Sequence, residues 1–227
     1  MRKAVGNMER FGMKYMTMTE MAAYQLREAI INGILPPGAQ LVPATLECEL
    51  GLGRVAIREA IRELSGSGLV VSVPNKGTYV TDPPDREELL TIFRLRYQLE
   101  GDAAGAAVGR ISAEELRRLE DLYRKMEDES LPYADTFLFN RRFHAILYRA
   151  SGWRFLCRVI GQLLDQVLLY RSSQRPPESF SFRPFNEEHR QILDALRNGD
   201  PDEARRMTVA NLQRGLDAVL LLEAPDS

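Results

Sequence analysis

The sequence predicts a mainly α-helical protein of two domains, in which three helices and a β-hairpin are followed by an all-helical bundle of six helices. Three observations lead to this prediction. Strand-like residues gather at residues 69–81, helical spacing of apolar residues dominates elsewhere, and the proline-containing stretch Asp82-Pro83-Pro84-Asp85 separates the two patterns. We therefore expect a mobile N-terminal arm over residues 1–17, a first domain over 18–82, a linker over 83–86 and a helical domain over 87–223.

The first two helices are predicted from the residues at their ends. Residues 17–32 begin with the capping-box pair Thr17 and Glu20 and end before Gly33, a residue type that suits a helix terminus. After a proline-rich turn, a short helix is expected from about Ala44 to Leu50.

The third helix follows the turn Gly51-Leu52-Gly53 and has two distinct faces. Its apolar residues recur at helical spacing and are Ile57, Ile61 and Leu64. Its basic residues recur at the same spacing on another face and are Arg54, Arg58 and Arg62. Two helices joined by a short glycine turn, the second with a basic face, form the helix-turn-helix pattern, whose second helix enters the DNA major groove. The alternative is a solvated arginine face on an ordinary amphipathic helix.

A β-hairpin is predicted directly after this helix. Residues 69–73 and 78–81 are strand-like, and Pro74-Asn75-Lys76-Gly77 has the residues of a turn. A hairpin in this position would be a wing, and Lys76 and Gly77 at its tip suit an approach to a phosphate or entry into the minor groove.

The second domain is predicted to be a six-helix bundle without an internal repeat. The expected helices cover about 85–109, 112–129, 133–151, 153–173, 184–198 and 201–222. The last of them begins at Asp200 and Pro201, a capping aspartate followed by a proline at the first helical position. The longest loop is expected over residues 172–183.

Composition argues against a simple nucleic-acid binder. The formal net charge is −2, and residues 1–82 hold nine Lys or Arg and eight Asp or Glu, so any DNA affinity must come from the local placement of arginines. Cys48 and Cys157 are too few for a disulfide scaffold, and we expect both to be buried thiols in a reducing compartment. No segment has the pattern of a signal peptide or a membrane span, so a cytoplasmic protein is expected.

These motifs resemble the GntR family of bacterial transcriptional regulators, specifically the FadR-type members whose effector domain is called FCD. In the first domain the resemblance rests on Gly33-x-Leu35-x-Pro37-Gly38-x-x-Leu41, the segment from Leu50 to Leu64, and Gly68-Leu69-Val70. In the second domain it rests on Leu95-Arg96-x-x-Leu99-Glu100, Phe143-His144, Glu188-His189-Arg190-x-Ile192, Gly199-Asp200-Pro201 and Ala204-Arg205-x-Met207. The resemblance covers about residues 20–222.

The resemblance implies a homodimer that binds palindromic double-stranded operator DNA, usually as a repressor, and whose DNA affinity changes with an organic acid or related metabolite. It places Arg54 and Arg58 at base or phosphate contacts and Gly77 at the minor groove. Arg62 is farther from the start of the helix and is expected either at a phosphate contact or in a surface ion pair. The family's usual Thr-Pro after the first of these arginines is here Val55-Ala56. Val55 is therefore expected to offer an apolar contact to a thymine methyl group, and the operator is expected to differ from the family norm.

The resemblance also implies an effector site at Asn140, His144, His189 and Asn211 of the helical domain. In many FCD domains these positions are Asp, His, His and His, and they bind a divalent metal that holds the effector's carboxylate. Because asparagine stands at two of these four positions, only two good metal ligands remain, His144 and His189. Three alternatives therefore stay open. They are a Zn or similar ion at His144, His189 and Asn140, a metal-free polar pocket that binds the effector directly, and two histidines with a structural role alone; we favour the metal-free pocket.

Arg96 is a further candidate for the effector site. Its guanidinium is expected either to hold an anionic group of the effector or to form an ion pair with Glu100 one helical turn away.

Two other functions compete with a sensing regulator. A metal-dependent enzyme would use His144 and His189 for catalysis, but no nucleophile or phosphate-binding loop is recognisable. A dimeric adaptor would not respond to a small molecule. We expect a regulator without enzymatic activity.

Overall fold

The computed structural model describes residues 16–128, 130–131, 133–173 and 186–221. The chain divides into two compact units, one formed by Met1–Leu89 with Leu164–Arg175 and the other by Leu90–Leu163 with Pro176–Ser227. The elements within these units agree with the expected mainly helical fold class, with a single two-stranded sheet in the described part of the chain. Of the arm expected over residues 1–17, only Met16 and Thr17 are among the described residues.

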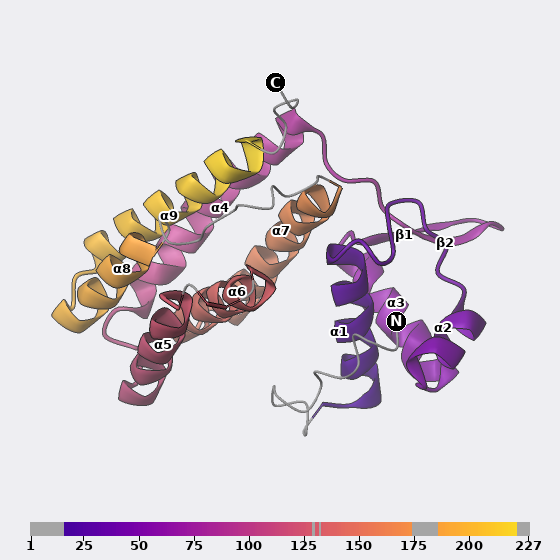
Figure 1. Ribbon diagram of the computed structural model, residues 1–227, viewed down its shortest axis with the longest axis horizontal. Helices are drawn as coiled ribbons and strands as arrows, with labels where there is room; N and C mark the ends of the chain where they lie inside the picture. The colour runs from indigo at the N-terminus through magenta and orange to yellow at the C-terminus, as the bar shows by residue number, and fades with distance from the viewer. Residues whose placement is uncertain (1–15, 129, 132, 174–185, 222–227) are drawn as a thin grey trace. The chain divides into compact units, whose positions relative to one another are not determined.

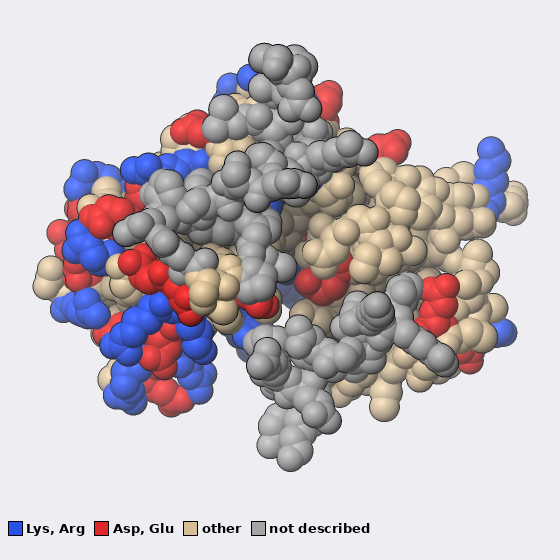
Figure 2. Space-filling model, in the orientation of Figure 1, with Lys and Arg blue, Asp and Glu red and all other residues tan. Residues whose placement is uncertain are grey.

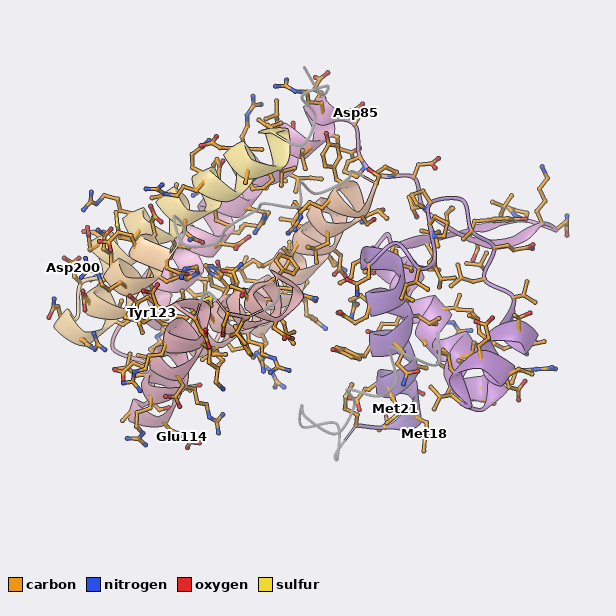
Figure 3. All side chains as sticks on the ribbon, in the orientation of Figure 1. Met18, Met21, Asp85, Glu114, Tyr123 and Asp200 are labelled. Atoms are coloured by element: carbon orange, nitrogen blue, oxygen red, sulfur yellow. The ribbon has the colours of Figure 1, made fainter. Side chains whose placement is uncertain are left out.

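In the described residues before the hairpin, the first unit has the helices α1 (Met18–Ile31), α2 (Pro43–Leu50) and α3 (Arg54–Gly66) (Figure 1). The capping box predicted for α1 is present, because Thr17 Oγ1 accepts a hydrogen bond from the Glu20 backbone N–H while the Thr17 N–H donates to the Glu20 carboxylate. Met18 and Met21 mark this end of α1 in Figure 3. Helix α2 ends at Gly51, whose φ of 65° is left-handed and favours glycine.

The predicted hairpin consists of β1 (Val70–Val73) and β2 (Gly77–Val80), paired antiparallel with Val70 opposite Val80. The chain before α2 runs along the free edge of β2, since the N–H groups of Gly38 and Leu41 donate to the carbonyls of Val80 and Thr78. This pairing ties the hairpin to the loop that leads into the helix-turn-helix.

The core of the first unit joins α1 and α3 to the hairpin. Ile57 and Leu64 of the predicted apolar stripe are completely buried in it, and so is Leu26 on α1. Leu169, far along the sequence, belongs to the same core and is also completely buried. The stretch Leu164–Arg175 therefore groups with the first unit, although it lies within the range 87–223 expected for the helical domain.

Polar contacts inside the first unit hold the same stretch in place. The Arg27 Nε donates to an Asp165 carboxylate oxygen at 3.0 Å, and the Gln166 side-chain amide donates to the Ser67 carbonyl at 3.2 Å. No pattern in the sequence indicated these contacts, because they join residues about a hundred or more positions apart.

In the part of the chain that the structure describes, six helices follow the hairpin: α4 (Arg86–Ala107), α5 (Ala113–Met126), α6 (Tyr133–Ala150), α7 (Arg154–Ser172), α8 (Asn186–Asn198) and α9 (Pro201–Leu221) (Figure 1). Asp200 begins α9 as predicted, because its carboxylate accepts from the Glu203 backbone N–H at 2.9 Å (Figure 3). The core of the second unit includes Phe143, Leu147 and Ile192. The loop expected over 172–183 lies almost wholly outside the described residues.

The surface of the second unit carries charges of both signs. Figure 2 shows cationic and anionic side chains intermixed over the helices of this unit, in keeping with pairs such as Arg190 with Glu187 and Arg206 with Glu203. The expectation that both cysteines are buried fails at Cys48, which is exposed, while Cys157 is half-buried. None of the described helices is both long and apolar enough to cross a membrane.

Candidate functional site

Helix α3 exposes the basic face that its sequence predicted. Arg54, Arg58 and Arg62 are all exposed, and Val55 is 77% exposed at the start of the helix. The opposite face is buried in the core of the first unit. The fold therefore presents this set of side chains to solvent on a rigid helix.

The three arginines of α3 differ in their partners. The Arg54 Nε lies 3.3 Å from a carboxylate oxygen of Glu47 on α2, and Arg62 lies 3.3 Å from the Glu59 carboxylate on its own helix. Within the described residues Arg58 has no hydrogen bond or ion pair. Glu47 was missed by the sequence reasoning, although its position seven residues before Arg54, across a tight turn, was a usable signal.

The wing tip is held by its backbone. The Lys76 carbonyl accepts hydrogen bonds from the Gln40 side-chain amide at 3.0 Å and from the Tyr79 hydroxyl at 2.9 Å, while the Lys76 side chain is exposed. Gly77 has a φ of 116°, and a Cβ placed on it would lie 2.8 Å from the Gln40 Nε2. The φ angle therefore favours glycine here, whereas the Gln40 amide is the end of an exposed, flexible side chain and can move away from an added Cβ.

A second group of polar residues lies inside the second unit. We call it the buried polar cluster, and it consists of Arg96 and Glu100 on α4, His144 and Tyr148 on α6, His189 on α8 and Asn211 on α9. None of these residues is more than 8% exposed. Buried polar groups of this kind are costly unless they bond one another.

One half of the cluster is built around the Glu100 carboxylate. The Arg96 Nε donates to Glu100 Oε1 at 2.6 Å, and the Tyr148 hydroxyl donates to Glu100 Oε2 at 2.6 Å. The Tyr148 oxygen also lies 2.9 Å from His144 Nδ1. Of the two roles expected for Arg96, the ion pair with Glu100 is the one present.

The other half of the cluster is built around His144 Nε2. This atom lies 3.2 Å from His189 Nε2 and 3.0 Å from the Asn211 side-chain oxygen. Phe143 packs edge-on against the His189 ring, with ring centroids 4.8 Å apart. The two halves meet in the His144 ring, so one connected network spans four helices.

Electrostatics keep the centre of the cluster uncharged. Burial, aided by the nearby Arg96 charge, lowers the pKa of His144 from 6.5 to about 4, and the hydrogen bond with Asn211 opposes this only in part. Burial and the Glu100 carboxylate raise the pKa of Tyr148 well above its ordinary value. At pH 7 His144 is therefore neutral, Tyr148 keeps its proton, and the Arg96 and Glu100 charges balance.

The structure brings together four of the five predicted effector-site residues: Arg96, His144, His189 and Asn211. Asn140 is half-buried, and in the described part of the chain no hydrogen bond joins it to the cluster. Tyr148 was missed by the sequence reasoning, although it lies one helical turn after His144.

The metal implied by the family resemblance was tested against these donors. Zinc sites in proteins use at least three protein ligands, and those ligands usually include anionic ones. Among the described residues no group of three or more His, Cys, Asp or Glu side chains could hold a metal ion. The cluster offers two imidazoles and an amide, while its carboxylate is turned to Arg96 and Tyr148. This donor set does not fit a resident divalent metal.

The chain matches two family models that lie end to end. Residues 18–80 match the bacterial regulatory proteins of the gntR family, and residues 91–214 match the FCD domain. The first match contains α3 and the hairpin, and the second contains every residue of the buried polar cluster.

Curated relatives and a solved structure agree with these matches. The HTH-type transcriptional regulator McbR of Escherichia coli is 27% identical over 211 residues, which is 90% of this chain and 93% of McbR. A protein of Paenarthrobacter nicotinovorans, described as a probable D-xylose utilization operon transcriptional repressor, is 30% identical over 84% of this chain and 85% of its own length. The structure of Escherichia coli McbR/YncC covers 91% of this chain and 98% of its own, with a TM-score of 0.80 and 24% identity, and shows the fold.

These relatives are transcriptional regulators rather than enzymes. The family expected from the sequence is thereby confirmed, and the metal-dependent enzyme is not supported. The chain belongs to the GntR family of bacterial transcriptional regulators, with an N-terminal gntR-type DNA-binding region and a C-terminal FCD domain.

Proposed function

We propose that this regulator represses transcription by binding operator DNA through α3 and the wing, and that a small metabolite bound at the buried polar cluster changes its DNA affinity. The observation that carries the DNA-binding part is the exposed face of Arg54, Val55 and Arg58 at the start of α3. The N-terminal residues of a recognition helix are those that reach base edges in the major groove.

Arg58 is the side chain best prepared to contact a base. Arg54 and Arg62 have carboxylate partners, whereas Arg58 has none among the described residues. An arginine that binds guanine O6 and N7 contributes about 1–3 kcal/mol of discrimination between bases. We assign Arg62 to a phosphate contact, Val55 to a thymine methyl group, and Lys76 and Gly77 to the minor groove.

The DNA-binding assignment is tested by fluorescence anisotropy with the DNA upstream of the chain's own coding region and a scrambled duplex of equal length. We expect Arg58→Ala to weaken binding to the upstream DNA roughly 5- to 150-fold, and to weaken binding to the scrambled duplex much less. Arg62→Ala is the matched variant and should weaken both duplexes similarly. If Arg58→Ala prefers the upstream DNA over the scrambled duplex as strongly as the wild type does, Arg58 does not contact a base and the assignment is wrong.

Repression is supported by the description of the Paenarthrobacter nicotinovorans relative as a repressor. A transcription assay on the upstream DNA decides it, because a repressor lowers transcription as its concentration rises. An increase would make the protein an activator.

The sensing part rests on the FCD match and on the cluster inside it. A polar network shared among four helices can change the packing of all four when a ligand replaces one of its hydrogen bonds. An organic-acid effector would not find an unpaired cation at Arg96, because Glu100 already pairs with that guanidinium. We propose that this site binds the metabolite without a metal. The competing function, a dimeric adaptor that senses nothing, predicts that no metabolite changes the affinity for DNA.

We also propose a homodimer, because symmetric dimers bind palindromic operators with one recognition helix in each half-site. Sedimentation equilibrium should give a particle mass twice the 25.8 kDa of the chain. A mass of one chain at micromolar concentration would contradict this.

A further inference from the structure

The hydrogen bonds of the buried polar cluster have a direction that is set at their charged end. The Glu100 carboxylate accepts from Arg96 at Oε1 and lies 2.6 Å from the Tyr148 oxygen at Oε2. Two oxygens approach this closely only with a hydrogen between them, and a carboxylate paired with a guanidinium has none to give. The Tyr148 hydroxyl hydrogen therefore points at Glu100.

This direction decides which nitrogen of His144 carries its hydrogen. A tyrosine hydroxyl has one hydrogen, so at its 2.9 Å contact with His144 Nδ1 the Tyr148 oxygen is the acceptor. The hydrogen of the neutral ring then sits on Nδ1, and Nε2 presents a lone pair.

The lone pair of His144 Nε2 faces the other two members of the cluster. His189 Nε2 lies 3.2 Å away and donates to it. The Asn211 side-chain oxygen is placed 3.0 Å away, and this assignment requires the amide to be turned over, so that its NH₂ group takes the position of the oxygen. In the alternative arrangement, with the hydrogen on His144 Nε2, the one hydroxyl hydrogen of Tyr148 could fill only one of its two contacts. Either the 2.6 Å contact with Glu100 or the 2.9 Å contact with His144 Nδ1 would then bring two lone pairs together.

From this geometry we infer that Glu100 and Tyr148 are positioning residues that hold His144 in its Nδ1–H form, so that the centre of the cluster is a hydrogen-bond acceptor. The consequence for sensing rests on the proposed function. A metabolite that reaches His144 Nε2 takes the place of His189 or Asn211, so it must bring a donor such as a hydroxyl or an N–H. A bare carboxylate oxygen would meet a lone pair at this atom.

The test is the protonation pattern of the two imidazoles in the full chain, measured by long-range ¹H–¹⁵N correlation NMR on ¹⁵N-histidine protein at pH 7.5. The chain has only two histidines, and His189→Gln assigns their signals. We expect His144 to show a protonated Nδ1 and an unprotonated Nε2. Hydrogen on Nε2, or on both nitrogens, would overturn the inference.

Two variants separate positioning from mere packing. Tyr148→Phe removes the acceptor at Nδ1, and in Glu100→Gln the amide NH₂ donates to the Tyr148 oxygen and turns the hydroxyl hydrogen toward Nδ1. Both variants should move the His144 hydrogen to Nε2, whereas Tyr97→Phe, which loses a hydrogen bond to Gln213, should leave the pattern unchanged. An Nδ1–H pattern that survives in a folded variant would overturn the inference.

The wild-type spectrum decides the inference even where a variant fails to fold. It is recorded without DNA or effector, so its outcome is independent of whether the proposed regulatory function holds.

Discussion

The Nε of Arg54 on α3 lies 3.3 Å from the Oε2 of Glu47 on α2, so the first basic side chain of α3 is already paired with a residue of the helix before it. Both side chains are well exposed, at 55% and 38%, and an exposed ion pair of this kind contributes about 0–1 kcal/mol. The pair holds the guanidinium in place weakly enough for DNA to compete for it. The Glu47 charge, however, would repel a nearby phosphate.

We therefore expect Glu47→Gln to tighten binding to DNA of any sequence and to steepen its salt dependence by about one unit of slope, because one more arginine becomes free to neutralise a phosphate. Dissociation constants measured at several salt concentrations give this slope. Glu49→Gln is the matched control, since it removes the same charge from the same helix at a residue with no ion pair among those described. Equal effects of the two changes would show that the contact with Arg54 is irrelevant.

Gly77→Ala should destabilise the wing by about 1–3 kcal/mol, because alanine is strained at a φ of 116°, and its Cβ would displace the Gln40 amide from its hydrogen bond to the Lys76 carbonyl. Urea unfolding gives the stability change, and DNA binding should weaken with it. Gly66→Ala is the contrasting variant, since Gly66 lies in α3 with nothing within 4 Å of the added carbon. There alanine should stabilise by up to about 1 kcal/mol, and a loss of the same size at both sites would contradict the account.

Acid should destabilise the protein through His144. The pKa of this ring is about 4 in the folded chain and 6.5 ordinarily, so between these values the unfolded chain binds a proton that the folded chain excludes. The stabilisation is complete above about pH 6.5 and is lost as the pH falls toward 4. At pH 5 the loss from this group is on the order of 2 kcal/mol.

The measurement is urea unfolding of the wild type and of His144→Gln at pH 7.5 and pH 5. The variant lacks the titrating ring, so its stability should fall less between the two pH values, while all other groups contribute equally to both proteins. If the free energy of unfolding of the two proteins fell equally between these pH values, a group other than His144 would cause the acid sensitivity.

Metal should neither accompany nor stabilise the wild-type protein. Protein purified without chelator should contain far less than one divalent metal per chain, and a chelator should leave its thermal midpoint unchanged. The variant with Asn140→Asp and Asn211→His restores the four residue types that many FCD domains use, so it should bind zinc at one ion per chain. One tightly held metal per wild-type chain, measured by mass spectrometry, would contradict the proposed metal-free site.

The elements of the fold were predictable because their signals are local. Thr17 and Glu20 form the capping box at the start of α1, Asp200 begins α9, and the hairpin turns where Asn75 and Gly77 allow positive φ angles. The basic face of α3 was equally local, because helical spacing alone separates Arg58 from Ile57 and Leu64.

The candidate effector site was only partly predictable. Four residues at family positions do meet in the buried polar cluster, but Tyr148, which links His144 to Glu100, was not singled out, and Asn140 is not bonded to the cluster among the described residues. Spacing along a helix places a side chain on a face, but it does not say which acceptor on another helix that side chain will find.

The sequence by itself determined the helices, the hairpin, the order of the two regions and the family, because capping, periodicity and turn chemistry act over a few residues. Tertiary structure alone decided that Leu169 completes the core of the first unit, that Tyr148 on α6 reaches Glu100 on α4, and that Glu47 on α2 meets Arg54 on α3. Such contacts join separate elements, and the low dielectric of the interior makes each buried polar group take whichever partner the packing brings within reach.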